Sequence, residues 1–316
     1  MADIVSTDNE PDVYLGTTME LDRRRMMRRA GLGIGAAALA ATGLLSSTTS
    51  AQAANQGAGP PDADIFNFAL NLEYLEAEFY LYAATGKGLP ANMRTGTGYQ
   101  GGVNPGIAVP FKSDAIQQYA QRIAVDEMSH IGFIRTVLGA NAVAEPTIDV
   151  GVGPNNAFSV LAVAAGLIQK GQTFNPYADD VSFLLGASIF EDVGVTAYAG
   201  AARYIGNPDF LEAAAGILAV EAYHSGAIRT LLGDLGAGKA FGLISALRGT
   251  LSSAGGLGAA EQPILIPGND YNFVANDSNG LAFRRSTRQV LNIVYGAANA
   301  SSGLFFPTGL SGNIKA

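Results

Sequence analysis

The sequence predicts an all-α protein whose centre is a bundle of four long helices. Four apolar segments carry the start and stop signals of helices, and they span residues 64–84, 114–138, 180–205 and 208–232. The four segments are similar in length, as the helices of a bundle must be. Two motifs also recur in them in the same order, which indicates that the second helical hairpin repeats the design of the first.

The ends of these segments are marked by residues that begin and end helices. The first segment follows the run PPDA and ends at Gly86. Ser113 is a suitable N-cap for the second segment, and Gly139 follows its last apolar turn. In the fourth segment Pro208 occupies the first helical position, and Gly233 is the expected stop.

The composition is that of a globular protein with a large core. Hydrophobic residues make up 48% of the 316 residues and charged residues only 15%, which excludes a disordered chain. The net charge of −8 and the lack of a dense basic stripe outside the leader argue against nucleic-acid binding. Because the sequence has no cysteine, it excludes disulfides, thiol catalysis and thiolate metal sites.

Both histidines of the chain lie in copies of one motif. The stretches that begin at Glu127 and Glu221 each read E-x-x-H-x-G-x-I-R-T-x-L-G, and their histidines are His130 and His224. A Glu three positions before each of only two histidines is hard to ascribe to chance.

The other two helices share a second motif, E-x6-Y. It runs from Glu73 to Tyr80 in the first helix and from Glu191 to Tyr198 in the third. The order E-x6-Y, E-x-x-H, E-x6-Y, E-x-x-H predicts two helical hairpins of one design that pack about a pseudo-twofold axis.

These motifs predict a metal site at the centre of the bundle. Positions i and i+3 share one face of a helix, so each Glu-x-x-His pair presents two ligand atoms to one point. Four carboxylates inside a bundle without countercharge would repel one another and carry a large desolvation cost. Two divalent cations would neutralise them, and an imidazole would complete each coordination sphere. The candidate ligands are Glu73, Glu127, His130, Glu191, Glu221 and His224.

Residues 64–232 resemble the ferritin-like four-helix bundle, as in bacterioferritin, rubrerythrin and manganese catalase. Such bundles hold two metal ions with a Glu from each of two helices and a Glu-x-x-His pair from each of the others. The resemblance implies that Glu73 and Glu191 are the lone carboxylates of their helices, and that Glu127 and Glu221 bridge the ions. Tyr80 falls where these families often place a tyrosine beside the metals.

The mature chain also resembles exported ferritin-like domain proteins related to plant desiccation-related proteins. The stretches that carry this resemblance are FALNLEYLEAEFYLYA, DEMSH, STRQVLNIVYG and GLFFPTGLSG. Two features depart from ferritin itself, namely the Gly-rich insert TGKGLPANMRTGTGYQGGVNPG after the first helix and the long, largely irregular extension over 234–316. These departures argue against a many-subunit storage shell.

The resemblance implies a protein with two iron or two manganese ions per chain that reacts with O2 or H2O2. Oxygen-rich ligands with one imidazole per ion suit iron or manganese better than copper or zinc. The sequence does not separate ferroxidase, peroxidase and catalase chemistry. One alternative is a non-catalytic desiccation or stress protein, in which the metal is structural and the insert and tail bind partners. Another is a protein that only sequesters metal.

Some side chains near the motifs have more than one interpretation. Glu76 shares a helix face with Glu73 and is the alternative ligand, although the internal repeat favours Glu73. Tyr80 and Tyr198 either pack in the core or contact the ligands. Glu78 is expected to face solvent or to pair with another segment.

Three further charged residues also have more than one interpretation. Asp192, like Glu78, is expected to face solvent or to pair with a residue of another helix. Arg135 and Arg229 recur at one offset from each histidine, and a favourable cation near a helix C-terminus would explain both.

The first 53 residues read as an export signal. The basic run RRRMMR at 23–28 precedes an uncharged stretch from Ala30 to Leu45 and a small-x-small site that ends at Ala53. The run resembles the twin-arginine pattern, which implies export of the folded protein to the periplasm or the exterior. The bundle is then expected over 54–233.

No transmembrane helix is expected in the mature chain, because the second segment carries too many polar groups for hydrocarbon. The third segment is nevertheless apolar all round, which predicts that it is buried all round. We expect the C-terminal extension, with its own helix near 284–296, to cover it. The helix expected at 155–169 and a homodimer partner are the other candidates.

Overall fold

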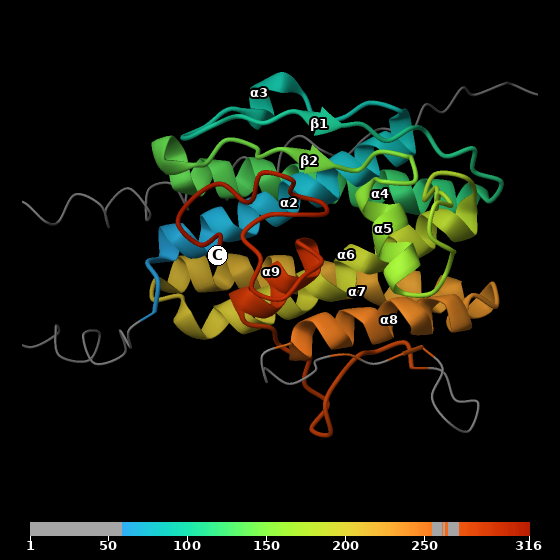
Figure 1. Ribbon diagram of the computed structural model, residues 1–316. Coiled ribbons are helices and arrows are strands. Elements are labelled where there is room, and N and C mark those ends of the chain that lie inside the picture. Colours follow the sequence, from blue (N-terminus) through green and yellow to red (C-terminus); the bar gives the residue numbers. More distant parts are fainter. Residues whose placement is uncertain (1–58, 255–260, 262, 265–271) are drawn as a thin grey trace, which may run out of the picture. The chain divides into compact units, whose positions relative to one another are not determined.

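The computed structural model describes residues 59–254, 261, 263–264 and 272–316. The export signal expected over 1–53 lies outside the described residues. Within them, helices dominate and the only strands are two residues long (Figure 1).

Four long helices form the bundle. They are α2 (Asp62–Thr85), α4 (Asp114–Leu138), α6 (Asp180–Ala201) and α7 (Pro208–Asp234). Helix α2 packs along α4 and α6 packs along α7, and contact of α2 with α6 joins the two hairpins (Figure 1). The predicted all-α four-helix bundle is confirmed. Helix α6 ends earlier than expected because a 3-10 turn, Ala202–Tyr204, follows it.

The helix ends follow the capping rules at most of the expected positions. Ser113 Oγ accepts a hydrogen bond from the backbone N–H of Ile116 at the start of α4. Helix α2 ends at Gly86, whose φ of 72° lies in the left-handed region that glycine adopts without strain. Gly233 does not stop α7, which runs one residue further, and the left-handed glycine after it is Gly236.

The Gly-rich insert is attached to the segment that follows α4. It contains α3 (Ala91–Arg94) and β1 (Val103–Asn104), and β1 pairs in parallel with β2 (Ile148–Asp149). A Cβ at Gly101 would collide with the backbone of Thr147. Only glycine therefore permits this close approach of the two segments.

Buried charges fasten the insert to the bundle. Arg94 forms an ion pair with Glu145 and lies 3.8 Å from Glu78 of α2. Glu78 and Glu145 are both buried, so Glu78 faces a partner from another segment and not the solvent. Arg135 donates hydrogen bonds to the Tyr74 hydroxyl and to a carbonyl of the insert. Arg135 lies in the last turn of α4, as expected, and it also anchors the insert.

The C-terminal extension covers α6. It contains α8 (Gly238–Ser253) and α9 (Thr287–Val294), and both contact α6 (Figure 1). Helix α9 was expected, but α8 was not. The sequence GKAFGLISALRGTLSS contains three glycines, which oppose helix formation, and α8 is stabilised instead by its tertiary contacts.

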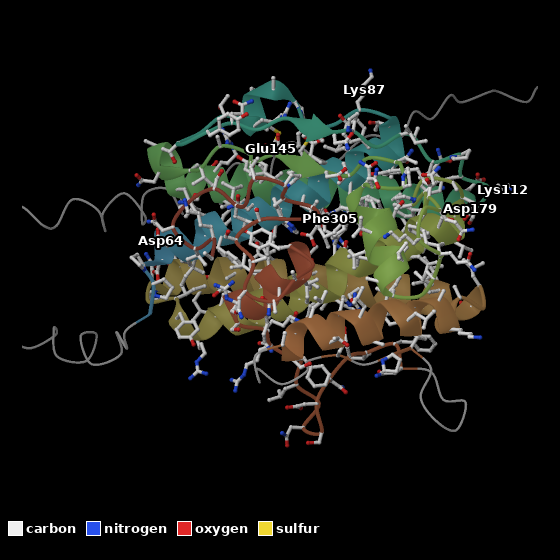
Figure 2. The ribbon with its side chains drawn as sticks, viewed as in Figure 1. Asp64, Lys87, Lys112, Glu145, Asp179 and Phe305 are labelled. Carbon is white, nitrogen blue, oxygen red and sulfur yellow. The ribbon has the colours of Figure 1, made fainter. Side chains whose placement is uncertain are left out.

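Aromatic rings complete this cover. Phe305, labelled in Figure 2, lies edge-on to Phe190 of α6, with ring centroids 4.9 Å apart. Phe158 of the short helix α5 (Ala157–Ala164) lies 5.8 Å from the same Phe190 ring. Residues 180–204 are apolar and long enough to span a membrane, but 89% of the most apolar window is buried inside the protein. The other bundle helices, the extension and α5 together account for that burial.

A buried ionic network joins α6, α7 and the extension. Asp192 pairs with Arg229 of α7 at 2.8 Å and with Arg248 of α8 at 2.6 Å. Arg248 and Arg285 also pair with Glu261. Burial alone would raise the pKa of Asp192, but Arg248 and Arg229 hold it well below its usual range. Asp192 is thus a partner across helices, and Arg229 is a buried ion-pair residue instead of a helix-end charge.

Residues far along the extension reach back to α2 near its centre. The backbone N–H of Ser311 donates to Asn71 Oδ1 at 2.8 Å, and Asn71 Nδ2 donates to the Ser311 carbonyl at 3.0 Å. The two residues are 240 positions apart. Side-chain amide and backbone thus satisfy each other inside the protein.

We predict that Asp192→Asn destabilises the metal-free protein by about 3–5 kcal/mol, because it removes a countercharge that the buried guanidinium groups of Arg229 and Arg248 share. Urea unfolding followed by circular dichroism measures this loss. Glu212→Gln, on the exposed face of α7, is the matched control and is expected to change stability by less than about 0.5 kcal/mol. Equal stability of the two variants would contradict the prediction.

Candidate metal centre

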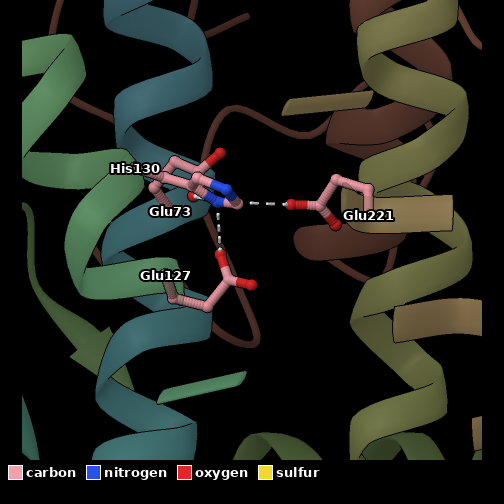
Figure 3. A group of neighbouring side chains, drawn as sticks. All are labelled: Glu73, Glu127, His130 and Glu221. Carbon is pink, nitrogen blue, oxygen red and sulfur yellow. Dashed lines mark hydrogen bonds and ion pairs between the residues drawn. The ribbon is translucent and has the colours of Figure 1, made fainter. Parts of the chain in front are cut away.

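Three helices of the bundle place four of the predicted ligands around one point. Glu73 of α2, Glu127 and His130 of α4, and Glu221 of α7 converge there (Figure 3). His130 Nδ1 lies 3.1 Å from Glu127, 3.2 Å from Glu73 and 3.8 Å from Glu221. One ligand atom from each residue lies within 4.8 Å of the others. This spacing lets one ion contact all four.

A second group lies beside the first and shares Glu127 with it. It consists of Glu127, Glu191 and His224. His224 Nδ1 is 3.1 Å from Glu127 Oε1 and 3.4 Å from Glu191 Oε2. The other oxygen of Glu127 faces His130. Glu127 therefore stands where a bridging carboxylate would stand, between one histidine and the other.

The structure thus brings all six predicted ligands together, and it leaves Glu76 out of both groups. Glu221 was expected to bridge, and by distance it reaches the first group. That these residues bind metal remains a prediction. The two ligand groups nonetheless have the expected composition. Each contains a lone glutamate, a histidine and the shared Glu127.

The centre is buried, and several of its polar atoms make no hydrogen bond to the residues that the structure describes. Glu73, Glu127, Glu191 and Glu221 have no exposed surface, and His130 and His224 are 8% and 4% exposed. Several of their atoms make no hydrogen bond within the described part of the chain: Glu127 Oε1, Glu191 Oε2, both Glu221 oxygens and His224 Nδ1. Buried polar atoms almost always have partners. Unpartnered oxygens and a ring nitrogen that face one space fit a bound cation.

Without a cation, protons would have to balance these charges. Burial raises the pKa of Glu73 to about 7, and burial together with Glu127 raises the pKa of Glu221 well above its usual range. Burial alone would lower the pKa of His130, but Glu73 and Glu127 raise it to about 11. The geometry therefore favours positive charge at the centre, whether from protons or from metal.

Two tyrosines reach across between α2 and α6 to the lone glutamates. The Tyr80 hydroxyl of α2 donates to Glu191 Oε1 of α6, and the Tyr198 hydroxyl of α6 donates to Glu73 Oε1 of α2. Both tyrosines are also buried in the core. Of the two interpretations of the E-x6-Y motif, core packing and contact with the ligands, both apply. Each tyrosine fixes one oxygen of a lone glutamate and leaves the other oxygen toward the centre.

Asp126 is a functional candidate that sequence reasoning missed. His224 Nε2 lies 3.2 Å from Asp126 Oδ2, opposite the ring nitrogen that faces the centre. Such a carboxylate orients a ligand histidine and fixes its tautomer. The signal was present, since Asp126 directly precedes Glu127 in DEMSH, whereas the second motif has Val220 at that place. The halves of the centre therefore differ in the support of their histidines.

The donor set suits iron or manganese. It contains carboxylate oxygens and imidazole nitrogens, and the chain has no thiolate. Such hard and intermediate donors bind divalent first-row ions, and softness disfavours Cu(I). The residues present therefore fit the metal centre that this kind of bundle implies.

Comparison with known proteins identifies the class of the chain. A family model described as the ferritin-like domain matches residues 61–234. The chain belongs to the ferritin-like domain family, as its resemblance predicted.

Two relatives extend this similarity over most of the chain. Desiccation-related protein PCC13-62 of Craterostigma plantagineum is 33% identical over 274 residues, which are 79% of this chain and 84% of that protein. Ferritin-like catalase Nec2 of Nesocodon mauritianus is 27% identical over 277 residues, which are 82% and 86% of the two chains. The predicted relation to desiccation-related proteins is confirmed. One relative is named for a stress and the other for a reaction.

We predict that Asp126→Asn weakens metal binding at the His224 half by about 10- to 100-fold, because loss of an orienting carboxylate has effects of this size. Binding at the His130 half should change less. Competition titration with a chelator of known affinity resolves the two steps. Asp114→Asn, at the exposed start of the same helix, is the control. Equal weakening of both steps would contradict the assignment.

We also predict that metal binding releases protons and strengthens as the pH rises. The pKa of His130 is about 11 in the metal-free protein, so its ring is protonated at neutral pH and must lose a proton before it binds metal. Apparent affinity should rise by about tenfold per pH unit for each proton released. Calorimetry in buffers of different ionisation enthalpy counts these protons. An affinity that is unchanged between about pH 6 and 8 would contradict the prediction.

Proposed function

We propose that the protein binds two iron or two manganese ions per chain and disproportionates H2O2. The observation that carries the proposal is the pair of ligand groups that share Glu127, with unpartnered atoms turned inward. Two adjacent ions that share a carboxylate suit a two-electron reaction of a small oxygen species. The relative named a ferritin-like catalase supports H2O2 as the substrate.

The reaction needs both electrons and protons to balance. One H2O2 gives up two electrons and two protons and leaves as O2. A second H2O2 takes up two electrons and two protons, its O–O bond breaks, and two waters leave. Bound metal would supply the storage of two electrons between these half-reactions.

The chain's own residues would hold the ions in place and exclude water. Tyr80 and Tyr198 fix the lone glutamates, so that their free oxygens keep one direction. Glu221, which lies in the first ligand group and whose two oxygens make no hydrogen bond among the described residues, would hold one ion from α7. The apolar core around the centre would exclude bulk water, which strengthens each electrostatic contact.

The decisive experiment measures metal and reaction on the same sample. We expect about two iron or manganese ions per natively produced chain by mass spectrometry, and O2 release from H2O2 at an oxygen electrode. The double variant Glu127→Ala/His130→Ala should lose both the metal and the O2 release, because it removes ligands from each half. Glu212→Ala, at an exposed position of α7, should lose neither. Metal-loaded protein that releases no O2 would overturn the catalase proposal.

Two other reactions of such a centre have separate signatures. A ferroxidase consumes O2 when Fe(II) is added, and a peroxidase consumes H2O2 only with an electron donor and releases no O2. Both can be read with the same electrode, so that each result assigns the chemistry.

A non-catalytic stress protein is the second candidate function. The relative named desiccation-related protein, at 33% identity, favours it. In that case the metal would be structural, and the insert and extension would bind partners. Metal removal should then lower thermal stability, and the loaded protein should show neither O2 consumption with Fe(II) nor O2 release from H2O2. A protein that only sequesters metal would bind it tightly with no sustained turnover.

We further propose that the protein is exported in folded form by the twin-arginine route to the periplasm or the exterior. The basic run at 23–28 and the uncharged stretch after it support this proposal. Changing Arg23 and Arg24 to Lys should keep the protein inside the cell, as cell fractionation would show. The same change at Arg28 and Arg29 is the control. Unchanged export of the first variant would argue for the general secretory route.

A homodimer stays a prediction, which sedimentation tests.

A further inference from the structure

Glu76 is a buried carboxylate beside the centre that neither ligand group uses. It is 4% exposed, and no hydrogen bond or ion pair to it is found among the described residues. Burial raises its pKa well above the usual range, and the charges of Glu221 and Glu127 add to this effect. An unpartnered buried carboxylate costs stability. A function beyond metal binding would explain its presence.

The internal repeat gives Glu76 no counterpart. When Glu73 and Tyr80 are aligned with Glu191 and Tyr198, Glu76 falls opposite Gly194. A Cβ at position 194 would collide with Glu221 Oε2.

That same Cβ would lie 3.4 Å from Glu76 Oε1. The glycine therefore leaves a space into which the carboxylates of Glu76 and Glu221 both reach. This space lies on one side of the pseudo-twofold axis only.

An apolar pocket opens onto this space. It lies between α2 and α6 under the extension, and Glu76 is its only charged lining residue. The apolar walls include Leu72, Leu75, Phe190, Val193, Val294 and Phe305. No residue of this wall is more than 7% exposed. Such a pocket admits small uncharged molecules and rejects anions, because the walls offer no cation and Glu76 lies at the inner end.

We propose that this pocket holds hydrogen peroxide beside the metal centre, with the carboxyl group of Glu76 hydrogen-bonded to the peroxide. The inference rests on the proposed function and adds the place where the substrate waits and the group that binds it. Hydrogen peroxide is small and uncharged at neutral pH, and it carries a hydrogen-bond donor at each end. Val294 and Phe305 of the extension set the size limit, so the extension selects the substrate.

The role of Glu76 is tested by two substitutions of graded severity. Glu76→Leu removes the hydrogen-bonding group, and Glu76→Gln keeps one of similar shape. Loss of this hydrogen bond should raise KM for H2O2 by about two- to tenfold in the Leu variant. The Gln variant should be intermediate, and metal content should stay unchanged in both. Glu78→Gln, in the same helix but paired with the insert, is the matched control.

Two results would overturn this role. A loss of metal from the Leu and Gln variants would make Glu76 a ligand, and an unchanged KM in both would remove it from substrate binding. The apolar substitution also gives a readout that needs no metal. Glu76→Leu should stabilise the metal-free protein, because an unpartnered buried carboxylate is removed. Destabilisation would show that the carboxylate has a structural partner, and would also contradict the proposal.

The size limit is tested at Val294. Val294→Ala should raise the rate with tert-butyl hydroperoxide relative to the rate with H2O2, because the wall of the pocket recedes. Val290→Ala removes the same atoms from a buried position of α9 that does not line the pocket, and it should leave the ratio unchanged. Equal ratios in the two variants would overturn the pocket as the peroxide site.

Failure of the pocket and failure of the proposed function give different results. If wild-type protein releases O2 from H2O2 while the Glu76 and Val294 variants behave as their controls, the pocket proposal fails and the catalase proposal stands. If metal-loaded wild-type protein releases no O2, the catalase proposal fails and this inference fails with it.

Crystals of the metal-free protein under xenon pressure give an independent check, because dry apolar cavities bind xenon. Xenon in the pocket of wild type and not of Val294→Phe supports the inference, and an empty pocket in both contradicts it.

Discussion

The concentration of buried acid at the centre of the bundle governs the rest of the structure. Glu73, Glu127, Glu191 and Glu221 are fully buried within a few ångströms of two histidines. Packed apolar groups cannot stabilise such a set, because ionised carboxylates lose their hydration and repel one another. Protons on the histidines, hydroxyl groups of two tyrosines and a bound cation can. The bundle, its cover and its insert keep water away from these groups while that balance is maintained.

The second buried set of charges has the opposite composition. Around Asp192, three arginines face two carboxylates, so the guanidinium groups are in excess. Asp192 follows the lone glutamate of α6 directly, and the two side chains leave the helix on different faces. One helix thus separates an acidic centre from a basic network. The extension supplies two of the three arginines, which explains why an apolar helix needs it for more than apolar cover.

Much of the fold and of the centre could be predicted because both depend on local spacing. The helix caps, the Glu-x-x-His pairs and the E-x6-Y pairs are all set within one or two turns. Helix α8 could not be predicted in this way, because its glycines oppose a helix and Arg248 stabilises it through residues of α6. The pairing of Tyr80 with Glu191 and of Asp126 with His224 also depends on how helices cross. The repeated E-x6-Y motif left a trace of the tyrosine contacts, and the asymmetry between otherwise equal Glu-x-x-His motifs left a trace of Asp126.

The contact of Ser311 with Asn71 also ties the first helix of the bundle to the end of the chain. Asn71 lies half a turn before Glu73 on α2, and its amide is satisfied by backbone that is synthesised 240 residues later. Contacts at such separations form slowly. The Asn71 side chain, two residues before the first metal ligand, therefore gains these two hydrogen bonds only when the extension has docked.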